Sequence, residues 1–234
     1  MTCTVDLFML NICSVSAADA SGWEEELDPH ERQQLGVFNS ETRRRQWTAA
    51  RVLLRRQLQA RLPGEALEFI QQPHGKPVLA SGHAHFNLSH SGDWLALALC
   101  REAPVGIDLE FGQRQRQVLV LARRFFAPVE SNWLAGLKER EQAAGFFRLW
   151  ARKEAVLKAH GGGLSAGLDK MVFHPDQQWR LDNQLDEHDY QISDTPFMSG
   201  WLALASQGEH QVNQHWLDGR LEIGTPPPHL AINL

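Results

Sequence analysis

The sequence predicts an α+β fold built from two pseudo-symmetric halves, each a long helix packed on a small antiparallel sheet. Two internal echoes indicate this duplication. The letters WLALA stand at residues 94–98 and again at 201–205. The helical pattern WTAARVLLR at 47–55 has the counterpart WARKEAVLK at 150–158. Because both echoes occur in the same chain order at nearly equal offsets, they favour a repeated α+β unit over chance.

The chain divides into an N-terminal half (1–103), a C-terminal half (104–224) and a short tail (225–234). Ala103 and Pro104 make a suitable linker between the halves. The tail begins with the letters TPPP, which cannot form regular secondary structure, so we expect it to be loose. Ligand sites tend to lie where such units meet, and we therefore expect the functional site at their junction.

The first expected element is a β-strand within residues 5–15. This run is apolar enough to suggest a signal peptide, but no basic segment precedes it, and Asp6 and Asn11 interrupt it. Elsewhere no stretch approaches the roughly 20 apolar residues that a membrane span requires. We therefore expect no membrane partner.

Each half contains one long predicted helix, at about residues 41–61 and 141–160. Pro63 and Gly64 end the first helix. Residues 161–163 are three glycines, and they end the second helix because glycine accepts the left-handed conformation of a helix C-terminus. Since these glycines follow a helix rather than precede one, they do not indicate a phosphate-binding loop.

Composition and charge exclude several classes of function. The 234 residues are 43% apolar and 22% charged, which is typical of a soluble globular protein. A formal net charge of −5 argues against general nucleic-acid binding. Cys3, Cys13 and Cys100 form no CxxC pair, so they are poor metal ligands, and they fit a reducing cytoplasm better than a secreted protein.

The segment VGIDLE at residues 105–110 indicates a metal site. In an extended strand, Asp108 and Glu110 emerge on one side, while the apolar positions supply the other. Two carboxylates in one small space raise each other's pKa unless a cation lies between them. Such oxygen ligands suit Mg²⁺, which usually also binds substrate phosphates. The alternative is a strand with two solvated acids.

A third carboxylate comes from the helix that contains WARKEAVLKAHG at 150–161. Glu154 lies at the edge of the apolar face of this helix, so we expect it to be half-buried. Lys158 follows one turn later and can pair with Glu154 or neutralise a phosphate. The alternative is an ordinary exposed pair. In the duplicated frame, Arg51 is the counterpart of Glu154.

Two motifs upstream make this interpretation more specific, GKP at 75–77 and FNLSHSG at 86–92. Pro77 restricts the backbone after Lys76, which would present the ammonium as a point charge to a phosphate. His90 stands between two serines after a short strand, where a turn would expose N–H groups and hydroxyls that suit a phosphate. The alternatives are a surface turn and an exposed histidine.

Together these motifs resemble the 4'-phosphopantetheinyl transferases of the long, Sfp-like type, in the order and spacing of that family over roughly residues 45 to 175. The resemblance implies the fold of that family and the Mg²⁺-dependent transfer of a phosphopantetheinyl group from coenzyme A to a carrier-protein serine, with release of 3',5'-ADP. It also assigns the metal-binding acids, which are Asp108, Glu110 and Glu154. The coenzyme A contacts that it implies are Arg51, Lys76, Ser89, His90, Asp108 and Lys158.

Catalytic roles and partners follow from the same resemblance. Glu154, or a metal-bound water beside it, would take the proton of the attacking serine, and Lys158 would stabilise charge on the leaving group. Family members often carry further basic residues for the 3'-phosphate, and here the candidates are Arg43, Arg44 and Arg45. We expect a cytoplasmic monomer whose partner is an apo acyl or peptidyl carrier protein, an acidic helical bundle.

The basic segment at 114–126 is either a solvated helix face or, as the resemblance suggests, the docking surface for that carrier. Two other functions stay open, a coenzyme A or nucleotide sensor and a Mg²⁺-dependent pyrophosphohydrolase. The three acids and Lys158 argue against a sensor, and a hydrolase would consume coenzyme A without a carrier. The sequence does not decide whether the carrier belongs to fatty acid, polyketide or nonribosomal peptide synthesis.

Overall fold

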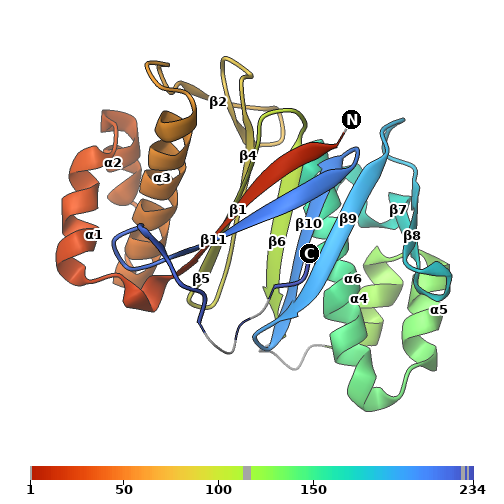
Figure 1. Ribbon diagram of the computed structural model, residues 1–234. Helices are drawn as coiled ribbons and strands as arrows, with labels where there is room; N and C mark the ends of the chain where they lie inside the picture. The colour runs from red at the N-terminus through yellow and green to blue at the C-terminus, as the bar shows by residue number, and fades with distance from the viewer. Residues whose placement is uncertain (1, 113–116, 228–229, 231) are drawn as a thin grey trace.

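The computed structural model describes residues 2–112, 117–227, 230 and 232–234, and it confirms the predicted α+β fold. Figure 1 shows two β-sheets side by side between two groups of helices. Helices α1, α2 and α3 lie on one outer side, and α4, α5 and α6 lie on the other. Their bounds are α1 Ala17–Trp23, α2 Pro29–Leu35, α3 Glu41–Arg61, α4 Val118–Phe125, α5 Pro128–Gly136 and α6 Glu139–His160.

The larger sheet has five strands in the order β12-β11-β1-β5-β4, and the smaller has three in the order β6-β10-β9. The strands of the larger sheet are β1 Cys3–Asn11, β4 His85–Ser91, β5 Trp94–Cys100, β11 His210–Leu217 and β12 Ile223–Gly224. Those of the smaller sheet are β6 Val105–Phe111, β9 Tyr190–Phe197 and β10 Gly200–Gln207. Two short hairpins join β2 Phe69–Gln71 to β3 Pro77–Leu79 and β7 Met171–His174 to β8 Arg180–Asn183.

The larger sheet is mixed, whereas the sequence predicted an antiparallel one. Strand β1 is antiparallel to β5, with Val5 opposite Cys100. It is parallel to β11, with Cys3 opposite His210. Because β11 comes from the second predicted half, the chain returns across the molecule to extend the sheet of the first half. A parallel pair needs a long crossover, and here the segments between β1 and β11 supply it.

Alternation along the strands produces three apolar layers. In β1, Phe8 and Leu10 pack toward α3, whereas Val5, Leu7 and Met9 lie in a core between the two sheets. A third layer lies between the smaller sheet and helices α4 to α6. The order of layers is therefore helix, sheet, sheet, helix.

The two long helices begin and end close to where the sequence predicts. Helix α3 has 21 residues, follows the N-cap Ser40 and ends at Arg61, shortly before Pro63. Helix α6 has 22 residues and ends at His160; Gly161 caps it with a φ of 85°, the left-handed conformation that glycine adopts without strain. Neither of these, nor any other helix in the described part of the chain, is long and apolar enough to cross a membrane.

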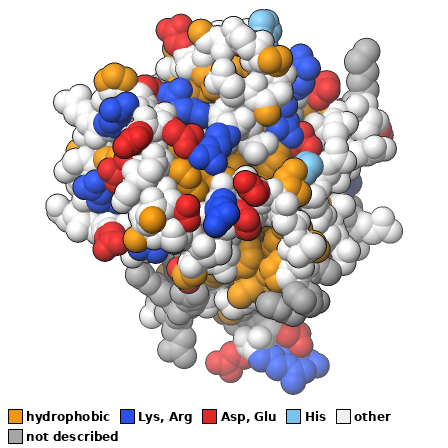
Figure 2. All heavy atoms as spheres, turned by 60° about the vertical axis from the view of Figure 1, so that its left-hand side comes forward, with side chains coloured by type: hydrophobic (Ala, Val, Ile, Leu, Met, Phe, Trp, Pro, Cys, Tyr) orange, Lys and Arg blue, Asp and Glu red, His pale blue; other side chains and the backbone are white. Residues whose placement is uncertain are grey.

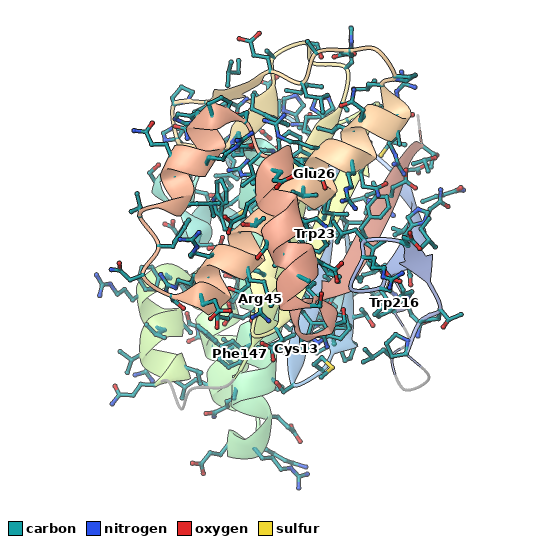
Figure 3. All side chains as sticks on the ribbon, turned by 90° about the vertical axis from the view of Figure 1, so that its left-hand side faces the viewer. Cys13, Trp23, Glu26, Arg45, Phe147 and Trp216 are labelled. Carbon is teal, nitrogen blue, oxygen red and sulfur yellow. The ribbon has the colours of Figure 1, made fainter. Side chains whose placement is uncertain are left out.

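The N-terminal helices are fastened to α3 by a cation–π contact and an ion pair. The guanidinium of Arg56 lies 5.9 Å from the ring of Trp23 and 2.5 Å from a carboxylate oxygen of Glu26. Trp23 is buried in the core under α3. Figure 3 shows Trp23 and Glu26 close together on the segment that covers this helix.

The predicted loose tail packs back onto the core between the sheets. Its described residues form no helix or strand, in agreement with the proline-rich sequence. Ile232, however, is buried in the core between the sheets, and its carbonyl accepts a hydrogen bond from Nε2 of Gln214 at 2.8 Å. An apolar residue after the prolines therefore returns the tail to the molecule.

Candidate functional site

The two sheets meet where β4 lies beside β6, and side chains of β4 join them. Asn87, Ser89 and Ser91 occupy alternate positions of β4 and therefore share one face. Each accepts a hydrogen bond from a backbone N–H group of β6, at 2.9, 3.0 and 3.2 Å respectively. The donors are Ile107, Leu109 and Phe111. Side-chain oxygen atoms thus replace the main-chain carbonyls of an ordinary strand pair.

Gly106 allows α6 to lie directly against β6. A Cβ atom at this position would lie 2.0 Å from the backbone oxygen of Ala155, so only glycine permits this approach. The close contact brings the part of α6 that carries Glu154 and Lys158 to the face of β6 that carries Asp108. Sequence positions about 50 residues apart are thereby joined in one site.

Lys158 and Asp108 form the centre of this site. Nζ of Lys158 lies 2.6 Å from Oδ1 of Asp108 and also donates to the carbonyl of Ile107 at 3.1 Å and to Oγ of Ser89 at 3.2 Å. Asp108 is only 5% exposed. The sequence predicted that Lys158 could pair with Glu154 along the helix. Its ion pair is with Asp108, because Gly106 places the strand within reach of the lysine, while its charge still opposes the rise in the pKa of Glu154.

Glu154 is half-buried beside this pair, as the helical pattern predicted. Burial raises the pKa of Glu154 to about 7; the negative charges of Asp108 and Glu110 add to the effect, and Lys158 opposes it. Oδ2 of Asp108 is buried without a hydrogen-bond partner among the described atoms. A cation would relieve both the unpaired oxygen and the repulsion between the acids.

The side chains nevertheless do not form a closed set of metal ligands. In the described ranges of the chain, no group of three or more His, Cys, Asp or Glu side chains is arranged to hold a metal ion. Oxygen donors and negative charge fit Mg²⁺. Strand β6 and helix α6 therefore bring the right donor types to one region, while Lys158 occupies one oxygen of Asp108.

A cavity of about 480 Å³ lies between α3 and β4, beside the same cluster. Ser89 and His90 lie on its wall together with Arg43 and Arg51, whose guanidinium groups make the wall basic. Of the three arginines that the sequence left undecided, Arg43 lies on this wall, whereas Arg44 and Arg45 form ion pairs with glutamates. A basic cavity of this size suits a ligand that carries phosphate groups.

His90 lies in β4, whereas the sequence predicted a turn at this position. The strand continues to Ser91 because the serines on either side of His90 bond to β6, and the turn follows. Burial lowers the pKa of His90, and the positive charges of Lys158 and Arg43 act in the same direction, against the opposing charge of Asp108.

Lys76 lies at the end of α6. Its Nζ donates to the carbonyls of Lys158 at 2.5 Å and Ala159 at 3.1 Å. The last carbonyls of a helix lack partners within the helix, so the ammonium satisfies them. Burial lowers the pKa of Lys76 to about 8. Lys76 thus fixes the end of the helix that carries Lys158.

The sequence analysis missed a buried ion pair beneath α6. Lys153 and Glu130 are both fully buried, with Nζ and Oε1 2.8 Å apart. Lys153 also donates to the carbonyl of Leu168, and Glu130 accepts backbone N–H groups of Ala127 and Phe173. The pair joins α5, α6 and β7. A lysine at a position that is apolar in a helical pattern is the signal that could have indicated it.

Comparison with known proteins identifies the family. A family model for the 4'-phosphopantetheinyl transferase superfamily matches residues 104–212, and a model for the N-terminal part of a 4'-phosphopantetheinyl transferase matches residues 16–102. A Synechocystis sp. protein whose name places it among these transferases is 34% identical over 185 residues, which cover 72% of this chain and 74% of that protein. The chain belongs to the 4'-phosphopantetheinyl transferase superfamily.

Two other 4'-phosphopantetheinyl transferases are similar over shorter stretches. Sfp of Bacillus subtilis is 36% identical over 132 residues, which cover 56% of this chain and 58% of Sfp. AcpT of Salmonella typhimurium is 40% identical over 121 residues, which cover 51% of this chain and 60% of AcpT. The chain thus spans less than two thirds of the length of these two relatives.

Both matched ranges contain residues that the sequence analysis assigned to the site. The range 16–102 contains Arg51, Lys76, Ser89 and His90. The range 104–212 contains Asp108, Glu110, Glu154 and Lys158. Of the basic segment that the sequence suggested for docking, residues 114–116 lie outside the described residues.

Proposed function

We propose that this transferase moves the 4'-phosphopantetheine group from coenzyme A to a serine of an apo acyl or peptidyl carrier protein, in a Mg²⁺-dependent reaction that releases 3',5'-ADP. The observation that carries the proposal is the junction of the sheets, where Asp108, Glu154 and Lys158 lie beside a basic cavity. Phosphoryl transfer depends mainly on positioning and on charge neutralisation, and this junction is suited to both.

Coenzyme A would bind in the cavity between α3 and β4. Arg43 and Arg51 can each offer paired N–H groups to a phosphate, and His90 adds a further donor or acceptor on the wall. Lys76 would act nearby, with its ammonium already bonded to the last carbonyls of α6. The net charge of −5 makes this local collection of basic groups more notable.

Asp108, Glu110 and Glu154 would hold Mg²⁺. The unpartnered Oδ2 of Asp108 supports this assignment, since a buried carboxylate oxygen without a donor is suited to a cation. When bound, Mg²⁺ would neutralise charge on the pyrophosphate and polarise its oxygen atoms.

The chain's own residues would move the proton and stabilise the leaving charge. A bond forms between the serine oxygen and the β-phosphorus of coenzyme A, and the bond from that phosphorus to the bridging oxygen breaks, so that 3',5'-ADP leaves. The serine proton passes to the carboxylate of Glu154 or to a water beside it. Lys158, held 2.6 Å from Asp108, would stabilise the negative charge on the leaving oxygen.

The carrier protein would dock on α4 and the start of α5. Arg123 and Arg124 are exposed on the last turn of α4, and Val120 and Val129 are 54% and 41% exposed. An acidic helical bundle would be attracted by the arginines and would cover the apolar side chains. By contrast, acidic and basic side chains are mixed on the face that Figure 2 shows.

Intact-mass measurement tests the proposed reaction. The transferase is incubated with coenzyme A, Mg²⁺ and a panel of apo carrier proteins from fatty acid, polyketide and nonribosomal peptide synthesis. We expect a carrier to gain the mass of one phosphopantetheinyl group only when coenzyme A and Mg²⁺ are both present. Equal loss of coenzyme A without a carrier would favour a pyrophosphohydrolase. Tight binding of coenzyme A with neither change would favour a sensor.

A further inference from the structure

Arg51 borders two cavities. One is the basic cavity of about 480 Å³ between α3 and β4. The other has a volume of about 650 Å³, and its lining includes Arg51, side chains at the start of α2 and residues of the β2–β3 hairpin. Asp28 and Glu31 lie on the wall of this second cavity. Arg51 therefore stands between basic groups on one side and two carboxylates on the other.

The two carboxylates are already held by Arg55. Its Nη2 lies 2.5 Å from Oδ2 of Asp28, and its Nε lies 2.9 Å from Oε2 of Glu31. In the part of the chain that the structure describes, the guanidinium of Arg51 forms no ion pair or hydrogen bond. Burial lowers the pKa of Arg51; the charge of Glu31 opposes this effect, that of Arg55 adds to it, and that of Asp28 opposes it. Arg51 is thus a half-buried cation without a bonded counter-charge.

The ring of Trp47 carries this guanidinium. Cζ of Arg51 lies 5.3 Å from the centroid of the Trp47 ring. The two residues are four positions apart on α3, so they lie on one face of the helix. Phe38 packs against Trp47 with 6.0 Å between the ring centroids. A cation is attracted to the face of an aromatic ring, and more strongly where water is excluded. Because Trp47 lies on the wall of the basic cavity, it holds the guanidinium on that side.

We propose that Trp47 is a positioning residue that holds the guanidinium of Arg51 at the basic cavity, where it binds a phosphate group of coenzyme A. Without the ring, the strongest attraction comes from Asp28 and Glu31 in the second cavity, where Arg51 would compete with Arg55. The inference rests on the proposed function, because coenzyme A is the ligand that it names. It goes further by assigning a residue that acts on the affinity for coenzyme A through Arg51.

Trp47→Leu removes the ring and leaves an apolar side chain. We expect the dissociation constant for coenzyme A, measured by calorimetry without a carrier, to rise by about 5- to 20-fold, since a charge-assisted contact to phosphate depends on geometry. The KM for the carrier should change by less than about threefold. Trp47→Phe keeps an aromatic face and should recover most of the affinity. Trp47→Met has a long, adaptable side chain and provides a second variant if leucine impairs folding.

A double-mutant cycle separates positioning from direct contact, because Trp47 itself lies on the cavity wall. Arg51→Met removes the guanidinium and should weaken coenzyme A binding at least as much as Trp47→Leu does. If Trp47 acts through Arg51, adding Trp47→Leu to Arg51→Met should change the dissociation constant by less than about twofold. If Trp47 instead binds the ligand by itself, the two losses of affinity multiply.

Trp179→Leu is the matched control. Trp179 is half-buried like Trp47, and Cζ of Arg148 lies 4.1 Å from its ring centroid. It belongs to the connection between β7 and β8 and not to the lining of either cavity. The variant removes a contact of the same kind, so the dissociation constant for coenzyme A should stay within about twofold of wild type. Urea unfolding of both leucine variants checks that each protein is folded during calorimetry.

Three results would overturn the inference. If Trp47→Leu binds coenzyme A as wild type does, or is weakened no more than Trp179→Leu, the ring does not position Arg51. If the losses multiply in the double variant, Trp47 is a ligand contact. A wild-type protein that binds no coenzyme A would overturn both this inference and the proposed function. Failure of the proposed function alone would instead appear as a wild-type protein that binds coenzyme A and modifies no carrier, and the cycle would then still test the role of Trp47.

Discussion

Asp6 shows how a single carboxylate can join three elements. On β1, its Oδ2 lies 2.7 Å from Nη2 of Arg61 at the end of α3. Its Oδ1 lies 2.8 Å from Nε2 of His215 on β11. Burial tends to raise the pKa of Asp6, but hydrogen bonds from His215 and Arg61, together with their charges, outweigh burial and lower it below 3.8.

Asp6→Asn should lower the free energy of unfolding near pH 7 by about 1–2 kcal/mol, because the amide keeps the shape but loses the charge-assisted bonds. Since the folded state lowers the pKa of Asp6, this stabilisation is complete well above pH 3.8 and is lost as the pH falls through the lowered value. Urea unfolding of wild type and Asp6→Asn near pH 7 and near pH 2.5 measures this stabilisation. The difference in unfolding free energy between wild type and Asp6→Asn should be smaller in acid.

Asp176→Asn is the control for this comparison, because Asp176 is exposed. It should leave the unfolding midpoint nearly unchanged at both pH values. If wild type and Asp6→Asn differ in unfolding free energy by as much in acid as at neutral pH, the charge of Asp6 does not stabilise the fold.

The sequence predicted which acids would share a region, but not how each side chain would bond. Strand alternation was enough to place Asp108 on the face opposite the apolar positions, and helical periodicity was enough to make Glu154 half-buried. The bonds of Ser89 to β6 and of Lys76 to α6 depend on contacts between segments far apart in the chain. Local patterns carry no information on such contacts.

Among the elements, β6 and α6 depend on one glycine. A Cβ at Gly106 would meet backbone atoms of α6 at 2.0 and 2.4 Å, and backbone cannot move aside as a flexible side chain can. Gly106→Ala should therefore push α6 away from β6. This displacement would separate Lys158 from Asp108.

We expect Gly106→Ala to cost about 1–3 kcal/mol of unfolding free energy and to reduce transfer at least about tenfold. Urea unfolding and the initial rate of carrier modification are the measurements. Gly22→Ala is the control, since a Cβ at Gly22 in α1 meets nothing within 4 Å, and alanine favours a helix. If both variants behave alike, the close approach at Gly106 does not hold the site together.

The two internal repeats differ in whether their corresponding residues occupy equivalent places in the structure. In the helical repeat they do, because Arg51 in α3 and its counterpart Glu154 in α6 are both half-buried. In the strand repeat, corresponding residues face different layers. Leu97 in β5 packs toward α3, whereas Leu204 in β10 lies in the core between the sheets. A shift of one residue moves every strand side chain to the other face, so equal letters do not guarantee equivalent places.

At the scale of the whole molecule, strands of both predicted halves share one sheet. The parallel pairing of β1 with β11 brings the C-terminal strands into the sheet of the first half. A pattern of alternating residues in 210–217 predicts a strand but not its partner. The strand with which residues 210–217 pair depends on the long-range packing of the two sheets, and local sequence patterns carry no information on this packing.

Charge reversal on α4 tests the proposed docking of the carrier. The double variant Arg123→Glu and Arg124→Glu should raise the KM for an acidic carrier by about tenfold or more, with little change in the KM for coenzyme A. Arg101→Glu, an exposed position in the turn after β5, is the control for net charge. If the KM for the carrier rises equally in the double variant and in Arg101→Glu, or does not rise in the double variant, the docking surface lies elsewhere.

The most direct test of the account is the Mg²⁺ dependence of transfer by wild type, Asp108→Ala and Glu154→Ala. Both variants should remain folded, as urea unfolding can check, although Asp108→Ala leaves Lys158 without its buried ion-pair partner and should be the less stable of the two. We expect each to lose transfer by several orders of magnitude, on the scale of electrostatic stabilisation in phosphoryl transfer, and to need more Mg²⁺ for what remains. A folded Asp108→Ala or Glu154→Ala protein with full activity and wild-type Mg²⁺ dependence would contradict the proposed site and its mechanism.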